Sequence, residues 1–330
     1  MTFLDQDIAP LGMGCWPIGG PMFSGDQSLG YANADDAESI RTIHAALDAG
    51  ITLFDTAAAY GAGHAERLLA EALKDRPEAL IVTKIGFIID EESKQLSFDE
   101  PEPAAVMPAI DRCLARLERD RIDLMLLHQN GLSLDRAEAV FDEMEKALQV
   151  GKIRSYGWST DFSERASIVA ERQHFIAVEH AMNVLIDAPR MQAVARQHQL
   201  TALIRSPLAM GLLTGKYGAD AVISTSDIRS TSNLVVRYFE DARANPTFLD
   251  QLDTVRDLLT TGGRSLVQGA IGWLWAKGDM NIPIPGARTV EQIEGIAGAI
   301  GFGPLPDHVM MEIDRMIERD PEDLNADRER

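Results

Sequence analysis

The sequence is poor in cysteine, in cationic side chains and in long apolar runs, and each shortage excludes a class of protein. Its 330 residues include only two cysteines, Cys15 and Cys113, which cannot form a disulfide framework and fit a reducing compartment. No run approaches the roughly 18 apolar residues of a membrane span. The first residues lack the basic and apolar regions of a secretory signal. These absences predict a cytoplasmic protein that does not enter the membrane.

Positive charge is also scarce, which restricts the possible partners. Lysine and arginine number 31 against 51 aspartates and glutamates, for a net charge of −20. Nucleic acids are bound through Lys and Arg contacts to phosphates, so this balance argues against a nucleic-acid partner and, more weakly, against an anionic membrane surface. A small anionic ligand would need locally placed cations, which makes individual basic residues informative.

Short apolar runs alternate with helical stretches along almost the whole chain, and eight of them are candidate strands. Continuous apolar runs are typical of strands with both faces buried. Strands that alternate with helices favour a closed (β/α)8 TIM barrel over an open doubly wound sheet. No linker rich in Pro, Gly or Ser divides the sequence, so we expect residues 1–330 to form a single domain. The eight candidate strands are residues 8–14, 51–55, 80–84, 122–128, 153–158, 175–179, 200–205 and 281–285.

Two connections are longer than the others. Residues 86–102 are acidic and lie close to several prolines, and residues 217–248 are polar with few periodic signals. Loops of this length are uncommon unless they serve a function. In a TIM barrel the active site lies at the C-terminal ends of the strands. We therefore expect these two segments to form lids over that face.

Three candidate strands in succession end in a residue with acid–base chemistry. Asp55, Lys84 and His128 end the runs, and Tyr60 follows Asp55 by five residues. Taken alone, each residue also has a structural explanation. Asp55 could cap a helix, Lys84 could be a charged surface residue, His128 could be a hydrogen-bonded polar residue, and Tyr60 could belong to a Tyr-Gly turn. Adjacent strand ends of a barrel line one face, so the joint placement favours a catalytic cluster.

These four groups together suit proton transfer to an oxygen. A phenol, with an ordinary pKa of about 10, is a poor acid at neutral pH. The ammonium of Lys84 is expected to favour the phenolate and lower the pKa of Tyr60. Asp55 would hold the ammonium in place, and His128 could orient the oxygen and share the proton. The set predicts protonation of a carbonyl oxygen while another group delivers hydride to the carbon.

The same residues lie in a motif that resembles the signature of the aldo-keto reductase family. Residues 54–69 read Phe-Asp-Thr-Ala-x-x-Tyr-Gly-x-Gly-x-x-Glu-x-x-Leu, and further matching blocks lie at 83–84, 126–128, 157–160, 206–216 and 284–288. The resemblance implies an oxidoreductase that reduces an aldehyde or ketone reversibly. It also implies that Tyr60 is the general acid, assisted by Lys84, Asp55 and His128.

An anion site is expected after the last candidate strand. Gly286 and Arg288 precede Thr289 and Gln292, which have the spacing of a capping box at a helix start. Free backbone N–H groups at this start and the Arg288 guanidinium would favour a phosphate, at the usual phosphate site of barrels. The bland alternative is an ordinary capped surface helix. Residues 61–66 resemble a glycine-rich dinucleotide-binding loop only in part, because Glu66 stands in place of its third glycine. A Rossmann site is therefore not expected there.

The resemblance implies a nicotinamide cofactor, with Arg288 facing the adenosine 2′-phosphate and favouring NADPH over NADH. No metal is expected. The family commonly has Asn, Gln, an aromatic residue and Asn where this sequence has Thr160, Glu179, Arg205 and Ile296. The implied cofactor-binding residues are Ser159, Thr160, Glu179, Arg205, Ser206, Leu208, Gly211, Lys216, Gly286, Arg288 and Gln292.

The substrate pocket is expected to include Trp16 and Phe87. Trp16 could wall the substrate, or it could simply pack at the rim of the core. The expected partner is a small carbonyl compound, with a sugar-like aldehyde as one guess. Two alternatives remain open: a nucleotide-sensing regulatory subunit of the same fold, and a barrel isomerase or lyase acting on a phosphorylated substrate.

Overall fold

The computed structural model describes residues 1–224, 227–231 and 237–322, and its centre is an eight-stranded parallel sheet. Each strand pairs with the next along the chain, from β3 to β16. The backbone of Gly14 closes the ring, because its N–H donates to the Pro285 carbonyl at 3.0 Å. The predicted (β/α)8 barrel is confirmed. Its strands are β3 (Gly12–Gly14), β6 (Leu53–Asp55), β7 (Leu80–Ile85), β10 (Leu124–Leu127), β11 (Tyr156–Ser159), β12 (Phe175–Ala181), β13 (Thr201–Arg205) and β16 (Asn281–Pro283).

The closure point requires a residue without a side chain. A Cβ atom on Gly14 would stand 2.6 Å from the backbone oxygen of Ile284, closer than two such atoms can approach. Glycine is typical of strand positions where another backbone comes this near. The first predicted strand, residues 8–14, is a strand only over Gly12–Gly14.

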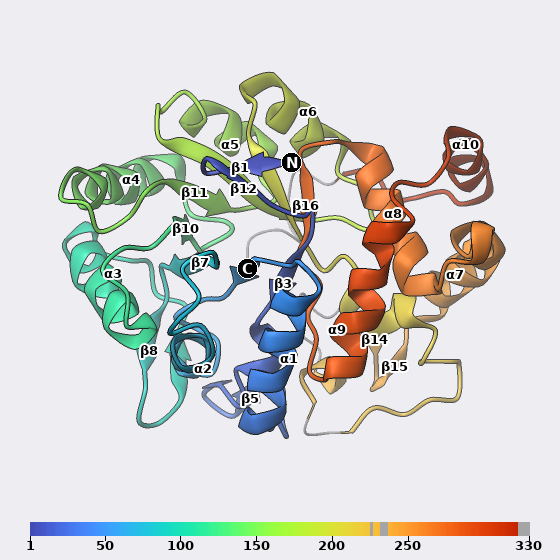
Figure 1. The fold of residues 1–330 in the computed structure, drawn as a ribbon, viewed down its shortest axis with the longest axis horizontal. Coiled ribbons are helices and arrows are strands. Elements are labelled where there is room, and N and C mark those ends of the chain that lie inside the picture. Colours follow the sequence, from blue (N-terminus) through green and yellow to red (C-terminus); the bar gives the residue numbers. More distant parts are fainter. Residues whose placement is uncertain (225–226, 232–236, 323–330) are drawn as a thin grey trace.

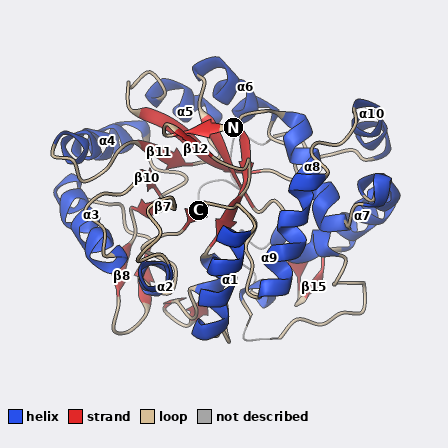
Figure 2. Ribbon diagram, viewed as in Figure 1, coloured by secondary structure: helices blue, strands red, loops and turns tan. Residues whose placement is uncertain are grey.

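Helices form an outer ring around the strands, as Figures 1 and 2 show. α7 and α10 lie beside α8 at one side of this ring. No helix among the described residues is long and apolar enough to cross a membrane. The helices are α1 (Asp36–Asp48), α2 (His64–Ala72), α3 (Pro103–Leu117), α4 (Leu134–Gln149), α5 (Ser163–Val169), α6 (Pro189–His198), α7 (Pro246–Leu259), α8 (Leu266–Lys277), α9 (Val290–Ala297) and α10 (Asp307–Met316).

An apolar core fills the interior of the barrel, inside the ring of strands. The hairpin of β1 (Thr2–Phe3) and β2 (Gln6–Asp7) contributes Phe3, and Ile8 follows it. Side chains on a strand alternate between the two faces of the sheet, so every second residue points inward. The inward-facing residues that share this core are Leu53, Leu80, Val82, Leu124, Leu126, Ala177, Leu203, Ile282 and Ile284.

The two long connections contain short regular elements. Residues 86–102 form the hairpin β8 (Ile88–Asp90) and β9 (Gln95–Ser97), which joins β4 (Phe23–Ser24) and β5 (Gln27–Ser28) in a four-stranded sheet. Residues 217–248 contain the 3-10 turn η3 (Ile228–Ser230), the hairpin of β14 (Phe239–Glu240) and β15 (Arg243–Ala244), and the start of α7. Positions 225–226 and 232–236 of this expected lid lie outside the described residues.

Candidate active site

The alternation of side chains along the strands places a layer of polar groups above the apolar barrel core. Asp55 follows the inward-facing Leu53 by two residues, and Lys84 follows Val82 in the same way. His128, which lies one residue beyond β10, follows Leu126 by the same spacing. Ser159, Glu179 and Arg205 continue the layer on β11, β12 and β13. The strand ends thus gather acidic, basic and hydroxyl groups at one end of the barrel.

Lys84 is the centre of this layer and is completely buried. Its Nζ donates to both carboxylate oxygens of Asp55, at 2.6 and 2.8 Å, and to the Thr56 carbonyl at 3.1 Å. It also lies 3.2 Å from the phenol oxygen of Tyr60. The structure therefore brings three of the four expected catalytic groups into one hydrogen-bonded cluster.

Glu179 is a second carboxylate on the same ammonium. Its Oε2 lies 3.2 Å from Lys84 Nζ, and its Oε1 accepts a hydrogen bond from Ser159 Oγ at 3.2 Å. The side chain is buried and lines the cleft. The sequence suggested only a cofactor contact for Glu179, so its pairing with Lys84 is a finding of the structure.

The expected lowering of the pKa of Tyr60 is wrong in direction. Burial raises it, and the charges of Asp55 and Glu179 add to that effect, so together they outweigh the lowering by Lys84. Burial also opposes a charge on Lys84, but the two carboxylates keep the pKa of that ammonium above its ordinary value. The phenol therefore holds its proton at neutral pH, as a proton donor must.

His128 lies beside the phenol and is neutral. Its ring centroid is 6.0 Å from that of Tyr60 and 4.8 Å from that of Phe87. Burial holds the pKa of His128 well below its ordinary value, and the charges of Lys84 and Arg205 lower it further. A neutral imidazole offers one N–H donor and one acceptor. It can therefore orient an oxygen placed against Tyr60.

A cleft of about 1490 Å³ opens above this layer. The residues expected at the active site line it, with two exceptions: Lys84, which contacts the cleft residue Tyr60, and Thr160. Thr160 follows the inward-facing Ser159 directly, so alternation turns it to the other face. Its hydroxyl donates to the Asn130 carbonyl at 2.8 Å. The structure therefore does not bring the Thr160 side chain to the cofactor cleft.

Aromatic rings wall the cleft next to Tyr60. Trp16 is stacked with Tyr60 at a centroid distance of 6.1 Å, and its indole N–H donates to the Leu29 carbonyl at 3.1 Å. Phe87 meets Phe98 edge to face at 5.5 Å, and its ring lies 4.8 Å from that of His128. The two expected substrate residues thus both line the cleft, with Trp16 against Tyr60 and Phe87 against His128.

Arg205 is held by a carboxylate that sequence reasoning did not identify. It forms a close ion pair with Asp161, whose other oxygen accepts from the Ala181 N–H at 2.8 Å. Burial alone would raise the pKa of Asp161, but the Arg205 charge and this hydrogen bond lower it. Asp161 lies two residues beyond Ser159, so the alternation along β11 is the signal that could have found it.

The helix start at α9 is less open to an anion than expected. The Val290 N–H donates to Glu38 Oε1 of α1 at 3.0 Å, and the Arg288 N–H donates to Gln292 Oε1 at 2.8 Å. Thr289 accepts from the Gln292 N–H at 3.3 Å, so only half of the predicted capping box forms. The prediction of free N–H groups is wrong for Val290 and Arg288, because a neighbouring helix and a local side chain bind them.

Side-chain cations nevertheless gather at this end of the cleft. Lys216 and Arg288 both line it, and within the described part of the chain neither is paired with a carboxylate. Arg229, which the sequence did not single out, is paired with Asp227 and donates to the Met210 carbonyl at 3.2 Å. In a chain of net charge −20, a pair of available cations marks the place where an anion can bind.

Arg229 also closes the turn η2 (Ala209–Thr214) that lines the cleft. Gly211 has a φ of 99°, a region that glycine adopts without strain, and a Cβ atom there would stand 3.3 Å from Arg229 Nη1. Tyr31 and Tyr217 face the same guanidinium, with 5.7 and 5.0 Å from its carbon to their ring centroids. Arg229 thus connects the turn to Tyr31, which lies far from it in the sequence.

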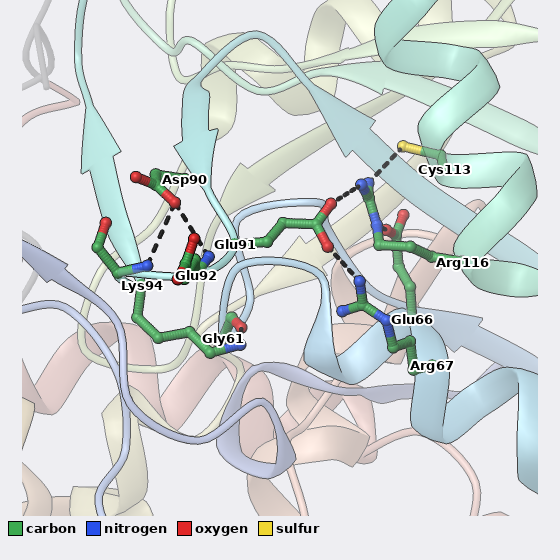
Figure 3. Close-up of polar contacts among 10 residues, drawn as sticks. Gly61, Glu66, Arg67, Asp90, Glu91, Glu92, Lys94, Cys113 and Arg116 are labelled. Carbon is green, nitrogen blue, oxygen red and sulfur yellow. Dashed lines mark hydrogen bonds and ion pairs between the residues drawn. The ribbon is translucent and has the colours of Figure 1, made fainter.

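The β8–β9 hairpin is attached to the barrel by a line of ion pairs, drawn in Figure 3. Glu91 contacts Arg67 of α2 and accepts from Arg116 Nη1 of α3 at 2.9 Å. Arg116 Nε donates to the buried Glu66 at 2.5 Å. Lys94 Nζ donates to the Gly61 carbonyl at 3.0 Å, one residue after Tyr60. The hairpin that carries the aromatic wall is therefore tied to the loop that carries the phenol.

Replacing Glu91 with glutamine should loosen this attachment. Glu91 is partly exposed, so we expect a stability loss of only about 0.5–1 kcal/mol. If the same free energy is lost from the position of Phe87 and Phe98, which flank the hairpin, the substrate KM should rise by up to about fivefold with little change in kcat. Urea unfolding and steady-state kinetics measure both. The control is Glu312→Gln, which removes an exposed ion pair on α10. Equal KM values for the two variants would contradict the attachment.

Comparison with known proteins agrees with the geometry. A model of the Aldo/keto reductase family matches residues 10–318. The chain is 29% identical over 306 residues to the aldo-keto reductase YhdN of Bacillus subtilis, covering 90% of this chain and 86% of that protein. It is 26% identical over 319 residues to the Schizosaccharomyces pombe aldo-keto reductase yakc [NADP(+)], covering 94% and 89%. The solved glycerol dehydrogenase AKR11B4 from Gluconobacter oxydans is 29% identical, with a TM-score of 0.79 and coverage of 94% and 92%.

Proposed function

This chain belongs to the aldo/keto reductase family, and we propose that it reduces an aldehyde or ketone reversibly with NADPH, using Tyr60 as the proton donor. One observation carries the proposal. The phenol oxygen of Tyr60 lies 3.2 Å from the buried ammonium of Lys84, which Asp55 holds by two hydrogen bonds. This cluster lies below a cleft wide enough for a nucleotide and a small substrate.

Tyr60, His128 and Lys84 have different roles in the proposed reduction. The substrate oxygen binds between the Tyr60 hydroxyl and the neutral His128 ring, which sets its direction. A bound nicotinamide nucleotide would supply the hydride that the carbonyl carbon accepts. Tyr60 gives its proton to the oxygen as negative charge develops there, and the Lys84 ammonium stabilises the phenolate that remains. The product is the alcohol, and the same groups serve its oxidation when the phenolate accepts the proton.

The cleft fits a phosphorylated dinucleotide. Lys216 and Arg288 provide the cations for its phosphates, and the glycine turn at Gly211 lets the backbone come close. Ser159 and Glu179 carry the hydroxyl and carboxylate that a carboxamide can bond. The residues that we propose to line the cofactor are Ser159, Glu179, Arg205, Ser206, Leu208, Gly211, Lys216, Gly286, Arg288 and Gln292.

Arg288 provides a test of the preference for NADPH. Substituting it with glutamine removes a charge-assisted contact to the 2′-phosphate, which should weaken NADPH binding by about 10- to 100-fold. NADH lacks that phosphate, so its Kd should change by less than about twofold. Fluorescence titration of both nucleotides measures this. Arg315→Gln on α10, which removes an exposed arginine, is the control. Equal weakening of both nucleotides would contradict the assignment.

We propose a small polar carbonyl compound of sugar-like type as the substrate. The cleft that Trp16 and Phe87 line also has polar residues, including Ser24, Gln27 and Glu100, that can bond substrate hydroxyls. The experiment is an NADPH titration followed by a panel of aldehydes, ketones and sugars. Tight NADPH binding without turnover of the panel would instead favour the nucleotide-sensing subunit.

We also propose that residues 1–330 act as one domain in the cytoplasm. The eight strands of the barrel come from the whole length of the described chain, so no part of it has a separate sheet of comparable size. Cys15 and Cys113 are both buried free thiols, which suits a reducing compartment.

A further inference from the structure

The cluster around Lys84 holds more acid than its ammonium can neutralise. Asp55 binds Lys84 Nζ at 2.6 and 2.8 Å, and Glu179 Oε2 lies 3.2 Å from the same nitrogen. Within the described residues, Glu179 Oε2 has no hydrogen-bond donor even though it is buried. Two carboxylates therefore face one buried cation, and Oε2 of Glu179 contacts that cation without a hydrogen bond in the described part of the chain.

The other charged or titratable groups near this cluster do not remove the imbalance. Arg205 is already paired with Asp161, and His180, on the strand of Glu179, bonds Gln192 through its Nε2. Burial keeps the pKa of His128 low and the pKa values of Cys15 and Tyr60 high, so all three are neutral near pH 7. The groups that surround the cluster are Cys15 after β3, Asp55 of β6, Tyr60 before α2, His128 after β10, Asp161 after β11, Glu179 of β12 and Arg205 of β13. His180 of β12 follows the inward-facing Glu179 directly and points to the other face, where it bonds Gln192 of α6.

The nicotinamide ring changes its charge in the proposed reaction. It is neutral in the reduced form and carries a positive charge in the oxidised form. Hydride transfer requires the ring to reach the carbon whose oxygen Tyr60 protonates, so this charge forms in the part of the cleft that Glu179 lines. An opposite charge nearby in a buried site stabilises the charged form.

We infer that Glu179 gives the cofactor site a pH-dependent preference for the oxidised, positively charged nicotinamide nucleotide. The inference rests on the proposed function. Glu179 supplies the carboxylate charge that Lys84 cannot balance once Asp55 is also ionised. A glutamine at this position would keep the bond from Ser159 but contribute no charge.

The pH dependence follows from Asp55. Burial raises its pKa well above the ordinary value, and the charge of Glu179 raises it further against the lowering by Lys84. Below that pKa Asp55 is protonated, and Lys84 and Glu179 balance each other. Above it the cluster has one net negative charge. The preference for the oxidised form should therefore be weak at low pH and strong at high pH.

The test measures binding rather than turnover. The Kd values of NADP+ and NADPH are determined with the wild-type protein from pH 5.5 to 9, and their ratio is followed. The 2′-phosphate, whose second pKa is about 6, titrates in both nucleotides and cancels in the ratio. We expect NADP+ to gain about tenfold or more over NADPH as the pH rises, the effect of roughly one pKa unit or more.

Two variants separate the charge from the shape of the side chain. In Glu179→Gln, Asp55 and Lys84 balance each other throughout, so the ratio should be independent of pH. In Glu179→Asp, which keeps the charge, the pH dependence should return in part. The matched control is Glu66→Gln, which removes another buried glutamate with a cationic partner, Arg116, and should keep the wild-type dependence. Thermal unfolding confirms that each variant is folded.

The possible outcomes are distinct. A wild-type ratio that does not change with pH would overturn the inference while leaving the proposed function intact, and this measurement does not depend on the folding of any variant. A Glu179→Gln protein with the wild-type dependence would overturn it as well. Failure of the wild type to bind either nucleotide would remove the proposed function itself.

Discussion

Replacing Tyr60 with phenylalanine should lower kcat for carbonyl reduction by about 10²- to 10⁴-fold, the range of general acid catalysis. The substitution removes only the hydroxyl that lies 3.2 Å from Lys84 and keeps the ring that stacks with Trp16. The cleft therefore keeps its shape, and the Kd of NADPH should change by less than about threefold. Steady-state kinetics and a fluorescence titration measure the two effects.

A second buried tyrosine provides the matched control. Tyr156 on β11 donates its hydroxyl to Glu145 at 3.0 Å, on the outer side of the barrel strands. Tyr156→Phe should cost some stability but leave kcat within about twofold. If Tyr60→Phe kept the wild-type rate while its protein was folded and bound NADPH, the phenol would not be the proton donor.

Replacing Lys84 with methionine should have the largest effect on stability. Lys84 is completely buried, and its removal leaves Asp55 and Glu179 without a cation. Breaking a buried ion pair by removing one partner typically costs about 3–5 kcal/mol, because an uncompensated charge stays in the interior. Urea unfolding measures the loss. Lys152→Met, which removes a partly exposed ion pair with Asp111, should cost less than about 1 kcal/mol.

The loss should also depend on pH, in a direction that follows from Asp55. The pKa of this carboxyl is already raised in the folded protein, and it should rise further without Lys84. A carboxyl with a raised folded pKa is harmless below its unfolded pKa of about 4 and destabilises as the pH rises through the folded value. The Lys84→Met deficit should therefore be smaller at pH 5 than at pH 8.

The double variant Lys84→Met, Glu179→Gln tests whether repulsion between the carboxylates contributes. With one carboxylate removed, part of the lost stability should return at pH 8, because only Asp55 remains without a partner. An equal deficit in the single and double variants would show that repulsion between Asp55 and Glu179 does not contribute to the loss.

The strand ends were predictable because their signals are local. A period of two along each strand puts Asp55, Lys84 and His128 on the inner face, and the order of the strands makes them neighbours. The same alternation explains the poor prediction for Thr160, which follows an inward-facing residue and therefore points outward. The segment at 217–248 was recognisable from its length and polarity, but the contact of its Arg229 with Tyr31 joins loops that are distant in the sequence.

Charge balance was not predictable in this way. The sequence indicated a tyrosine beside a lysine, and from that pair alone a lowered phenol pKa. Burial and the carboxylates of Asp55 and Glu179 reverse the direction, and both depend on how the strands close into a ring. The hydrogen bond between Glu38 of α1 and the Val290 N–H at the start of α9 was not predictable either, because it depends on the packing of these two helices.

The order of residues by itself determined the barrel, the acid–base group and the family, because each rests on spacing along single strands and on one continuous motif. Tertiary structure alone decided that Glu179 shares Lys84 with Asp55 and that Arg205 pairs with Asp161. These contacts join strands and loops that are not adjacent in the sequence, and their energies depend on burial. In the function that we propose, Asp55, Tyr60, Lys84 and His128 serve the reaction, and the packing of Asp55 and Glu179 around Lys84 sets the charge that a bound cofactor would meet.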